Sequence, residues 1–363
     1  MRRVVINGRF LSQAITGVQR FAREVVRALD GLIEQEEVNP REFQFSLAVP
    51  PGFESDLGLR HIPLRVVGKG RGQLWEQASL ALHDRSALLL SLCNLGPITR
   101  PHQVVVLHDA SVFAVPSAYS FAFRNWYRIN IRGLGRRAAR VITPSRFSAT
   151  ELARYAGIAD DRFTVVHLGA DHLDAVEPDQ TVFARHQIGQ RPYILAVSSE
   201  APHKNLVALV HALPLLRTTV PDLEVVSVGG SFPAIFAGQK GPPEQIRRVG
   251  YTRDAELKAL YQRAQCFVYP SWYEGFGLPP LEAMRTGCPV IVSRAASLPE
   301  ICGDGALYFD PNDPASLAEA ASRLMGDEGL RDSMRVAGQQ RAAQFSWRKT
   351  ARGVFEVLRG VLR

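Results

Sequence analysis

The chain has 363 residues, of which 46% are hydrophobic, 21% charged and 9% aromatic, and its formal net charge is +8. This composition excludes a disordered protein, a collagen-like fibre and a small disulfide scaffold, since it can bury sizeable hydrophobic cores. The length predicts two domains. No apolar stretch approaches the roughly 18 residues of a membrane-spanning helix, and the stretch after Arg3 is too short for a signal peptide, so a cytoplasmic protein is expected.

Strands and helices alternate in the N-terminal half. Short apolar runs predict strands at Val4–Asn7, Phe45–Val49, Leu88–Leu92, Val104–Leu107, Arg140–Thr143 and Phe163–His167. Helical periodicity and a capping serine predict helices at Val18–Leu29, Leu74–Leu82, Phe121–Arg137 and Ser145–Tyr155. Such alternation is typical of a parallel sheet with helices on both faces.

The alternation lapses in a polar stretch and then restarts. We therefore predict a first domain at 1–170, a linker at 171–190 and a second domain at 191–363. Predicted strands of the second domain are Tyr193–Ser198, Leu223–Gly229, Arg247–Tyr251, Cys266–Tyr269, Val290–Ser293 and Ala306–Phe309. Its predicted helices are Asn205–Leu216, Asp254–Ala264, Pro279–Thr286, Pro314–Met325, Gly329–Phe345 and Trp347–Leu362. Two doubly wound α/β domains bind ligands beyond the carboxyl ends of their strands, which predicts one shared cleft.

The segment Tyr269–Pro289, YPSWYEGFGLPPLEAMRTGCP, carries the most chemistry. A predicted strand ends at Tyr269, a glycine-rich loop follows, and a helix begins at Pro279. Glycines let a backbone approach a ligand closely, and the free N–H groups at a helix start suit a phosphate. Glu274 in the loop and Glu282 in the first helical turn add carboxylates, which accept hydrogen bonds from sugar hydroxyls. The combination favours a site for phosphate and sugar groups over the alternative, in which Glu282 only caps the helix and Glu274 is solvated.

A second strand–loop–helix segment, Leu195–Asn205, reads LAVSSEAPHKN. Lys204 falls at the predicted helix start, where a cation opposes the helix dipole. A diphosphate in front of the helix would make that position favourable. Lysine is rare in this arginine-rich chain, so a compact ammonium is a plausible reason for its presence here.

Two positions stand out in the N-terminal half. Gly17 lies between the first strand and the first helix, where its N–H could reach a phosphate, although a plain turn glycine fits equally well. His108 follows a predicted strand. A histidine at the carboxyl end of a strand faces the predicted cleft, and a structural histidine is the alternative.

Residues 111–150 contain seven arginines and no acidic residue. Five of the arginines recur every four residues: Arg124, Arg128, Arg132, Arg136 and Arg140. On a helix this spacing places neighbours on one face, although Gly133 and Gly135 oppose an unbroken helix. The charge suits acidic lipid head groups or a phosphorylated acceptor, and a solvated face is the alternative. No nucleic-acid-binding motif accompanies it, so nucleic acid is not an expected partner.

Taken together, these features resemble the GT-B glycosyltransferases of the retaining family 4. The likeness is densest in Val249–Pro311, where Glu274 and Glu282 match the E-x7-E motif of that family. The resemblance implies two Rossmann-like domains facing a central cleft. The first would bind the acceptor and the second the nucleotide-sugar, and the last helix, about 347–363, would pack back on the first domain.

The resemblance also assigns roles to matching positions. Glu274, Lys204 and His108 are the expected catalytic residues: Glu274 binds donor-sugar hydroxyls, Lys204 neutralises the diphosphate, and His108 lies near the sugar. Glu282 would hold the ribose. The expected donor-binding residues are Gly17, Ser199, His203, Lys204, Gly250, Tyr251, Glu274, Gly275, Phe276, Gly277, Leu278 and Glu282.

One departure concerns the loop before the lysine. Some members of the family carry an arginine there, whereas this chain has Ser198 and Ser199. Lys204, His203 and backbone donors would then meet the diphosphate charge. Arg294 or an arginine of the N-terminal domain is a possible substitute.

The resemblance implies a retaining hexosyltransferase that needs no metal and no cofactor. Its donor is expected to be GDP-mannose, with UDP-glucose, dTDP-rhamnose or GDP-fucose as alternatives. The acceptor would be a lipid-linked glycan or a polysaccharide precursor, and the arginine-rich stretch would hold the protein peripherally at the inner face of the plasma membrane. A sugar-nucleotide epimerase, a glycosidase and a non-catalytic nucleotide-sugar binder are the other functions considered.

Overall fold

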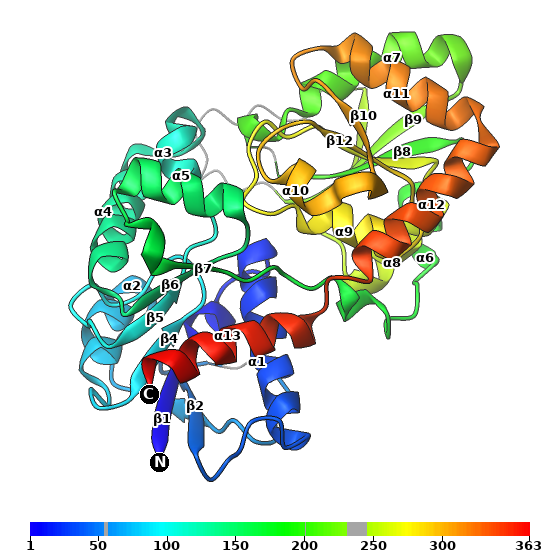
Figure 1. The fold of residues 1–363 in the computed structure, drawn as a ribbon. Coiled ribbons are helices and arrows are strands. Elements are labelled where there is room, and N and C mark those ends of the chain that lie inside the picture. The colour runs from blue at the N-terminus through cyan, green and yellow to red at the C-terminus, as the bar shows by residue number, and fades with distance from the viewer. Residues whose placement is uncertain (54–56, 200, 231–244) are drawn as a thin grey trace. The chain divides into compact units, whose positions relative to one another are not determined.

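The computed structural model describes residues 1–53, 57–199, 201–230 and 245–363. The chain divides into two compact units, each built on a parallel sheet (Figure 1). The first unit comprises Met1–Phe113, Arg124–Gly169 and Ser346–Arg363. The second unit comprises Ala114–Phe123 and Ala170–Phe345.

The sheet of the first unit has the order β3-β2-β1-β4-β5-β6-β7, and every neighbouring pair is parallel. Its strands are β1 (Arg2–Asn7), β2 (Phe43–Val49), β3 (Leu64–Val66), β4 (Leu88–Ser91), β5 (Gln103–Val106), β6 (Arg140–Thr143) and β7 (Phe163–Val165). Central strands are apolar on both faces because helices cover both sides. The direction of winding reverses between β1 and β4, which is therefore the switch point of this sheet.

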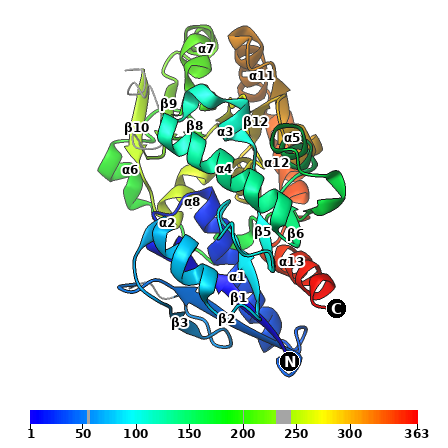
Figure 2. The same ribbon diagram turned by 90° about the vertical axis from the view of Figure 1, so that its left-hand side faces the viewer.

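Helices flank both faces of this first sheet. They are α1 (Gly17–Glu34), α2 (Gly72–Trp75), α3 (Ser111–Ala114), α4 (Phe121–Arg137), α5 (Arg146–Ala156) and α13 (Trp347–Val361). Figure 2 shows α2 and α4 on one side of the sheet and α1 and α13 on the other. Phe21, Val25 and Leu29 repeat along α1 with helical spacing and are fully buried, which explains how α1 docks.

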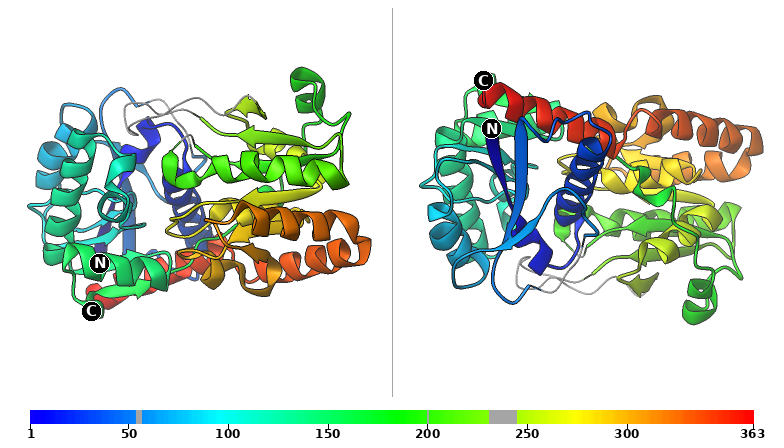
Figure 3. Two further views of the ribbon diagram at one scale, coloured as in Figure 1. Left: turned by 90° about the horizontal axis from the view of Figure 1, so that it is seen from above. Right: turned by 90° about the horizontal axis from the view of Figure 1, so that it is seen from below.

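The sheet of the second unit has the order β10-β9-β8-β11-β12-β13 and is also parallel. Its strands are β8 (Tyr193–Val197), β9 (Glu224–Val228), β10 (Ile246–Gly250), β11 (Cys266–Tyr269), β12 (Val290–Ser293) and β13 (Leu307–Phe309). Its helices are α6 (Thr181–His186), α7 (Leu206–Thr219), α8 (Asp254–Arg263), α9 (Leu278–Arg285), α10 (Leu298–Cys302), α11 (Pro314–Gly326) and α12 (Glu328–Ala342). Figure 3 shows α7 and α11 side by side. Winding reverses between β8 and β11.

Both units have the doubly wound parallel architecture predicted from the sequence. Residues 171–190 differ from the expected linker, because they include α6 and cluster with the second unit. This polar stretch packs on the second unit instead of bridging freely: Asp174 pairs with Arg285 of α9 and Asp179 with Arg253 beside α8.

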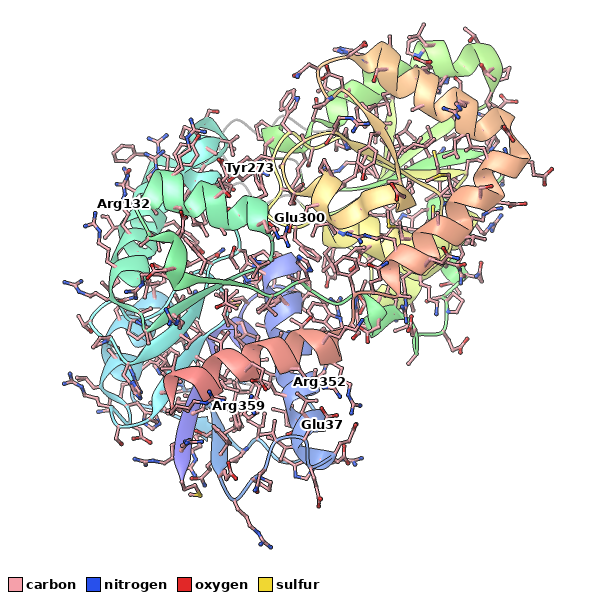
Figure 4. The ribbon with its side chains drawn as sticks, viewed as in Figure 1. Glu37, Arg132, Tyr273, Glu300, Arg352 and Arg359 are labelled. Carbon is pink, nitrogen blue, oxygen red and sulfur yellow. The ribbon has the colours of Figure 1, made fainter. Side chains whose placement is uncertain are left out.

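The last helix, α13, belongs to the first unit although it follows the second in sequence. It packs along α1, and Figure 4 shows Arg352 of α13 beside Glu37 after α1. Arg352 Nε lies 2.6 Å from Glu37 Oε2. A Cβ on Gly169 would lie 2.2 Å from the backbone nitrogen of Trp347. Only glycine therefore lets the backbone at residue 169 pass this close to the start of α13.

Candidate functional site

The carboxyl ends of β8 and β11 carry the two most informative loops of the second unit. The first loop leads from β8 through the 3-10 turn Pro202–Lys204 into α7. The second leads from β11 into α9, which begins at Leu278, one residue before the prediction. Because winding reverses between these two strands, their loops diverge and leave room for a ligand.

Lys204 and Glu274 form an ion pair across this switch point. Lys204 Nζ lies 2.7 Å from Glu274 Oε1, and the Ser271 hydroxyl donates to the same oxygen at 2.5 Å. Lys204 Nζ also donates to the Tyr269 hydroxyl at 3.5 Å. The side chains of Lys204 and Glu274 are 18% and 11% exposed, so the pair is shielded on most sides and still reachable.

The surroundings of the Lys204–Glu274 pair shift the pKa values of the ionisable side chains near it. Burial opposes ionisation of Glu274, but the charge of Lys204 and the hydrogen bonds from Lys204 and Ser271 outweigh burial and lower its pKa. Burial and the neighbouring Lys204 lower the pKa of His203 to about 3, so this imidazole is neutral at neutral pH. Burial and the charge of Glu274 raise the pKa of Tyr269. A carboxylate and an ammonium therefore face the same space.

Contacts with residues of the next loop hold the loop that carries Glu274 in place. The Ser297 hydroxyl lies 2.9 Å from the carbonyl oxygens of both Glu274 and Phe276. Gly277 caps α9 with φ of 103°, and a Cβ there would lie 2.7 Å from Leu298. The remaining loop residues expected to contact the donor, Gly275 and Leu278, are buried. The backbone of the loop that precedes α9 is therefore held in one conformation by these contacts.

Glu282 is buried in α9, where both carboxylate oxygens have protein partners. Oε1 lies 3.2 Å from His172 Nε2, and Oε2 lies 3.2 Å from the Tyr261 hydroxyl. Burial and the charge of Glu282 raise the pKa of Tyr261 well above its ordinary value. Neither partner was predicted from sequence, since His172 lies in the expected linker and Tyr261 in the otherwise ordinary helix α8.

The remaining predicted donor contacts of the second unit lie on the same edge of the sheet. Ser199 follows β8 and is half-buried. Gly250 ends β10 with φ of 79°, and its neighbour Tyr251 is 63% exposed. The space around Gly250 is open, because an added Cβ would meet no described atom within 4 Å.

Asn205 joins three loops of the second unit and was missed by the sequence analysis. Its side-chain amide donates to the carbonyl oxygens of Pro270, at 3.1 Å, and Pro311, at 2.9 Å. Its φ of 55° lies in the left-handed region, which asparagine adopts more readily than most residues. The asparagine directly after Lys204 was the available signal. It fixes the lysine loop relative to the loop after β11.

In the first unit, Gly17 begins α1 and His108 follows β5. No described atom lies within 4 Å of an added Cβ on Gly17. His108 is buried, with Nε2 2.9 Å from the Leu92 carbonyl and its ring 4.8 Å from that of Phe21 on α1. Burial lowers the pKa of His108, which favours the neutral imidazole. Phe21 thus connects the helix of Gly17 with His108.

The arginine-rich stretch differs from the predicted stripe in two respects. Arg140 lies in β6, beyond the end of α4, so it does not continue the helical row. Gly133 and Gly135 do not interrupt α4; they bring it against Ile98 and Ile158, which a Cβ would meet at 2.8 and 2.2 Å.

The other four arginines, Arg124, Arg128, Arg132 and Arg136, do lie on α4. Burial and repulsion from Arg124 and Arg132 lower the pKa of Arg128. The guanidinium groups of Arg128 and Arg132 lie 5.4 and 5.0 Å from the ring centre of Phe113. In the described part of the chain, no helix is long and apolar enough to cross a membrane.

Comparisons with known proteins agree with this architecture. The family model "Glycosyltransferase Family 4" matches residues 15–172, and "Glycosyl transferases group 1" matches residues 179–341. Each match covers the greater part of one sheet and its helices. Together they include Gly17, His108, Lys204, Glu274 and Glu282.

Curated relatives include several mannosyltransferases. The chain is 31% identical to O-antigen chain mannosyltransferase B of Escherichia coli, over 68% of this chain and 68% of that protein. It is 29% identical to the serotype-specific mannosyltransferase WbdA of E. coli, over 63% of this chain but only 29% of that protein. It is 27% identical to O-antigen chain mannosyltransferase RfbU of Salmonella typhimurium, over 63% of this chain and 62% of that protein.

Solved structures share the fold at low sequence identity. A sucrose-phosphate synthase from Thermosynechococcus elongatus superposes with a TM-score of 0.74 at 18% identity, over 99% of both chains. Anabaena HepE, in complex with UDP and glucose, superposes with a TM-score of 0.71 at 18% identity, again over 99% of both chains.

Proposed function

This chain belongs to the GT-B glycosyltransferases of family 4, and on that premise we propose that it transfers mannose from GDP-mannose to a glycan hydroxyl with retention of anomeric configuration. The observation that carries the proposal is the Lys204–Glu274 ion pair at the switch point of the second sheet. The choice of mannose is supported by the O-antigen mannosyltransferase relatives.

The two charged side chains of the pair would bind different parts of the donor, Lys204 the diphosphate and Glu274 the sugar. Departure of the nucleotide puts negative charge on the diphosphate, which Lys204 and the N-terminus of α9 would stabilise. Glu274 would accept hydrogen bonds from hydroxyls of the donor sugar. Glu282 would hold the ribose, and Gly250 and Tyr251 would adjoin the base.

Retention would follow from attack on the face that the diphosphate leaves. The acceptor hydroxyl would approach the anomeric carbon from that face, and a phosphate oxygen would take its proton. His108 would contribute a neutral imidazole near the sugar, and Gly17 a backbone N–H near the phosphates. Neither a metal nor a resident cofactor is part of this proposal.

The acceptor would be a lipid-linked glycan or a polysaccharide precursor. The arginines of α4 would hold the protein at an anionic membrane surface on the cytoplasmic side, since a cluster of like charges attracts acidic head groups. Vesicle flotation with and without acidic lipid, repeated with Arg132→Gln/Arg136→Gln, tests this part independently of catalysis.

Donor binding can be tested by calorimetry with GDP, UDP, dTDP and their sugar conjugates. We expect GDP-mannose to bind, Lys204→Met to weaken binding of both GDP and GDP-mannose, and Glu274→Gln to weaken only the part that depends on the sugar. Lys69→Met and Glu319→Gln change exposed residues outside the site and serve as controls. Binding of another nucleotide would overturn the GDP assignment, and equal binding by Lys204→Met would overturn the site. Anomeric analysis of the product tests retention.

A further inference from the structure

A pocket of about 490 Å³ opens beside the Glu274 loop in the second unit. Its lining comes from the end of β13, from residues that follow β11, β12 and β13, and from the start of α11, so it lies at the carboxyl edge of the sheet. Its lining residues include Trp272, Arg294, Tyr308, Asp310 and Asn312. None of these five residues takes part in the proposed function above, although Arg294 was considered from the sequence as a cation for the donor diphosphate.

Polar groups in the pocket lack protein partners. Within the described residues, no hydrogen bond or ion pair is found for the Trp272 indole N–H, the Arg294 guanidinium or the Asn312 side-chain amide. Asp310 Oδ1 accepts from the Asn312 backbone N–H at 2.9 Å, and its other oxygen has no partner in the same part of the chain. All four side chains are exposed and line the pocket, so their donors and acceptors are available to a ligand.

Trp272 is the second distinguishing feature. It is 45% exposed, whereas Trp75 and Trp347 are buried and Trp126 is half-buried. An exposed indole next to a polar pocket offers a flat apolar face and one hydrogen-bond donor. That pairing matches a sugar ring, which has an apolar C–H face and a polar rim.

Contacts within the second unit hold several pocket residues in place. Arg294 lies over the Tyr308 ring at 4.8 Å, and the Tyr308 hydroxyl donates to the Gly303 carbonyl at 2.7 Å. The Trp272 backbone N–H donates to the His203 carbonyl at 2.9 Å. Asn205 bonds Pro311 in the wall of the pocket, so the pocket and the Lys204 loop share one support.

Charge in the pocket argues for a neutral ligand. One guanidinium and one carboxylate balance each other, and the other polar groups are an amide and an indole. We propose that this pocket binds a neutral hexose unit of the acceptor glycan next to the site of transfer. The inference rests on the proposed function, because it assumes a saccharide acceptor.

Tryptophan fluorescence provides a direct test, because Trp272 is the solvent-facing indole next to the pocket. Full-length protein is titrated with α-mannotriose as a soluble surrogate for the acceptor. We expect a saturable change in emission that is lost in Trp272→Phe. Saturation-transfer NMR should still detect the trisaccharide with Trp272→Phe, and should show binding about tenfold weaker with Trp272→Ala and with Arg294→Ala.

The exposed residue Leu215, which lies on α7, supplies the control variant Leu215→Ala. Kinetics separate the pocket from the donor site: Trp272→Ala should raise the KM for acceptor about tenfold and leave the KM for GDP-mannose unchanged. A raised donor KM alone would place the donor sugar in the pocket and overturn the proposal. Undiminished trisaccharide binding by both alanine variants would also overturn it. If the wild-type protein bound no nucleotide-sugar at all, the proposed function itself would fail, whatever happened to the trisaccharide.

Discussion

Each of the two sheets holds a glutamate–cation pair at its switch point, and the two pairs differ in burial. Lys204 and Glu274 of the second unit are 18% and 11% exposed. Arg9 and Glu76 of the first unit are 7% and 1% exposed, with Arg9 Nε 3.1 Å from Glu76 Oε1. A pair that serves a ligand must keep an open side, whereas a pair that ties loops together can be sealed. The same topology thus holds a pair that remains partly open to solvent and a pair that is sealed.

The partners of the sealed pair support this distinction. The Asn7 amide, at the end of β1, donates to Glu76 Oε1 at 2.6 Å and approaches the Ser91 hydroxyl of β4 at 3.5 Å. Glu76 begins a five-residue π-helical segment, Glu76–Leu80, that directly follows α2. The pair therefore joins the ends of β1 and β4 to the segment beside them.

The largest expected effect is the loss of stability when the sealed Arg9–Glu76 pair is broken. Arg9→Met leaves a buried carboxylate without its cation, so the free energy of unfolding should fall by about 3–5 kcal/mol, measured by urea denaturation. The double variant Arg9→Met/Glu76→Leu should recover most of that loss, because no buried charge remains. A loss below about 1 kcal/mol in the single variant would show that the pair is not structural.

The reachable pair should respond in activity more than in stability. Lys204→Met should lower kcat/KM about 10²–10³-fold, because in the proposed mechanism it removes the fixed cation beside the leaving diphosphate. Transfer assays with GDP-mannose measure this loss, and the melting temperature is followed in parallel. If stability fell as steeply as it does in Arg9→Met, the contrast between the two pairs would disappear.

His172 should have a smaller effect that is confined to nucleotide binding. His172→Phe removes a hydrogen bond to buried Glu282, and we expect GDP to bind about tenfold more weakly. His172→Gln retains a donor and should restore part of the affinity. The affinity ratio between GDP and 2′-deoxy-GDP should shrink in His172→Phe if Glu282 holds the ribose. An unchanged ratio would argue that Glu282 acts elsewhere.

The smallest effect concerns the docking of α13. Hydrogen bonds from Arg352 and Arg348 lower the pKa of exposed Glu37 to about 2, from a usual 4.5. A lowered pKa stabilises the fold above the usual value and loses that contribution as the pH falls toward about 2. Glu37→Gln should therefore lower the melting temperature slightly near neutrality, with a difference that shrinks on acidification. A difference that does not vary with pH would exclude the ion pair as its cause.

Apolar and periodic runs in the sequence predicted most of the fold, because they reflect which residues are buried. The bounds of α4, β6, β11 and β12 agree with the prediction to the residue, since each apolar or periodic run ends at a polar or turn-forming residue. The three-residue strand β3 was missed, because its residues Leu64–Val66 are exposed and show no alternation. Helix α6 was missed because its surroundings are polar and its burial arises only from packing on the second unit.

The candidate site likewise contains residues that local sequence predicted and residues that only the folded structure brings together. The sequence predicted Glu274, Glu282 and Lys204 as site residues, because loop glycines, helix starts and charges lie close together along the chain. Their partners His172 and Tyr261 lie 110 and 21 positions from Glu282, and no local pattern links residues so far apart. Asn205 was adjacent to a predicted residue, but its role depends on carbonyl groups brought near by the fold.

The sequence by itself determined the two parallel α/β units and the loops that carry the charged groups, because hydrophobic periodicity and turn chemistry are local properties of the chain. Tertiary structure alone decided which charges meet, which pair is sealed, and that glycines in α4 permit close packing instead of breaking the helix. It also returned α13 to the first unit. These outcomes depend on contacts between distant segments, whose energies arise only when the chain is folded.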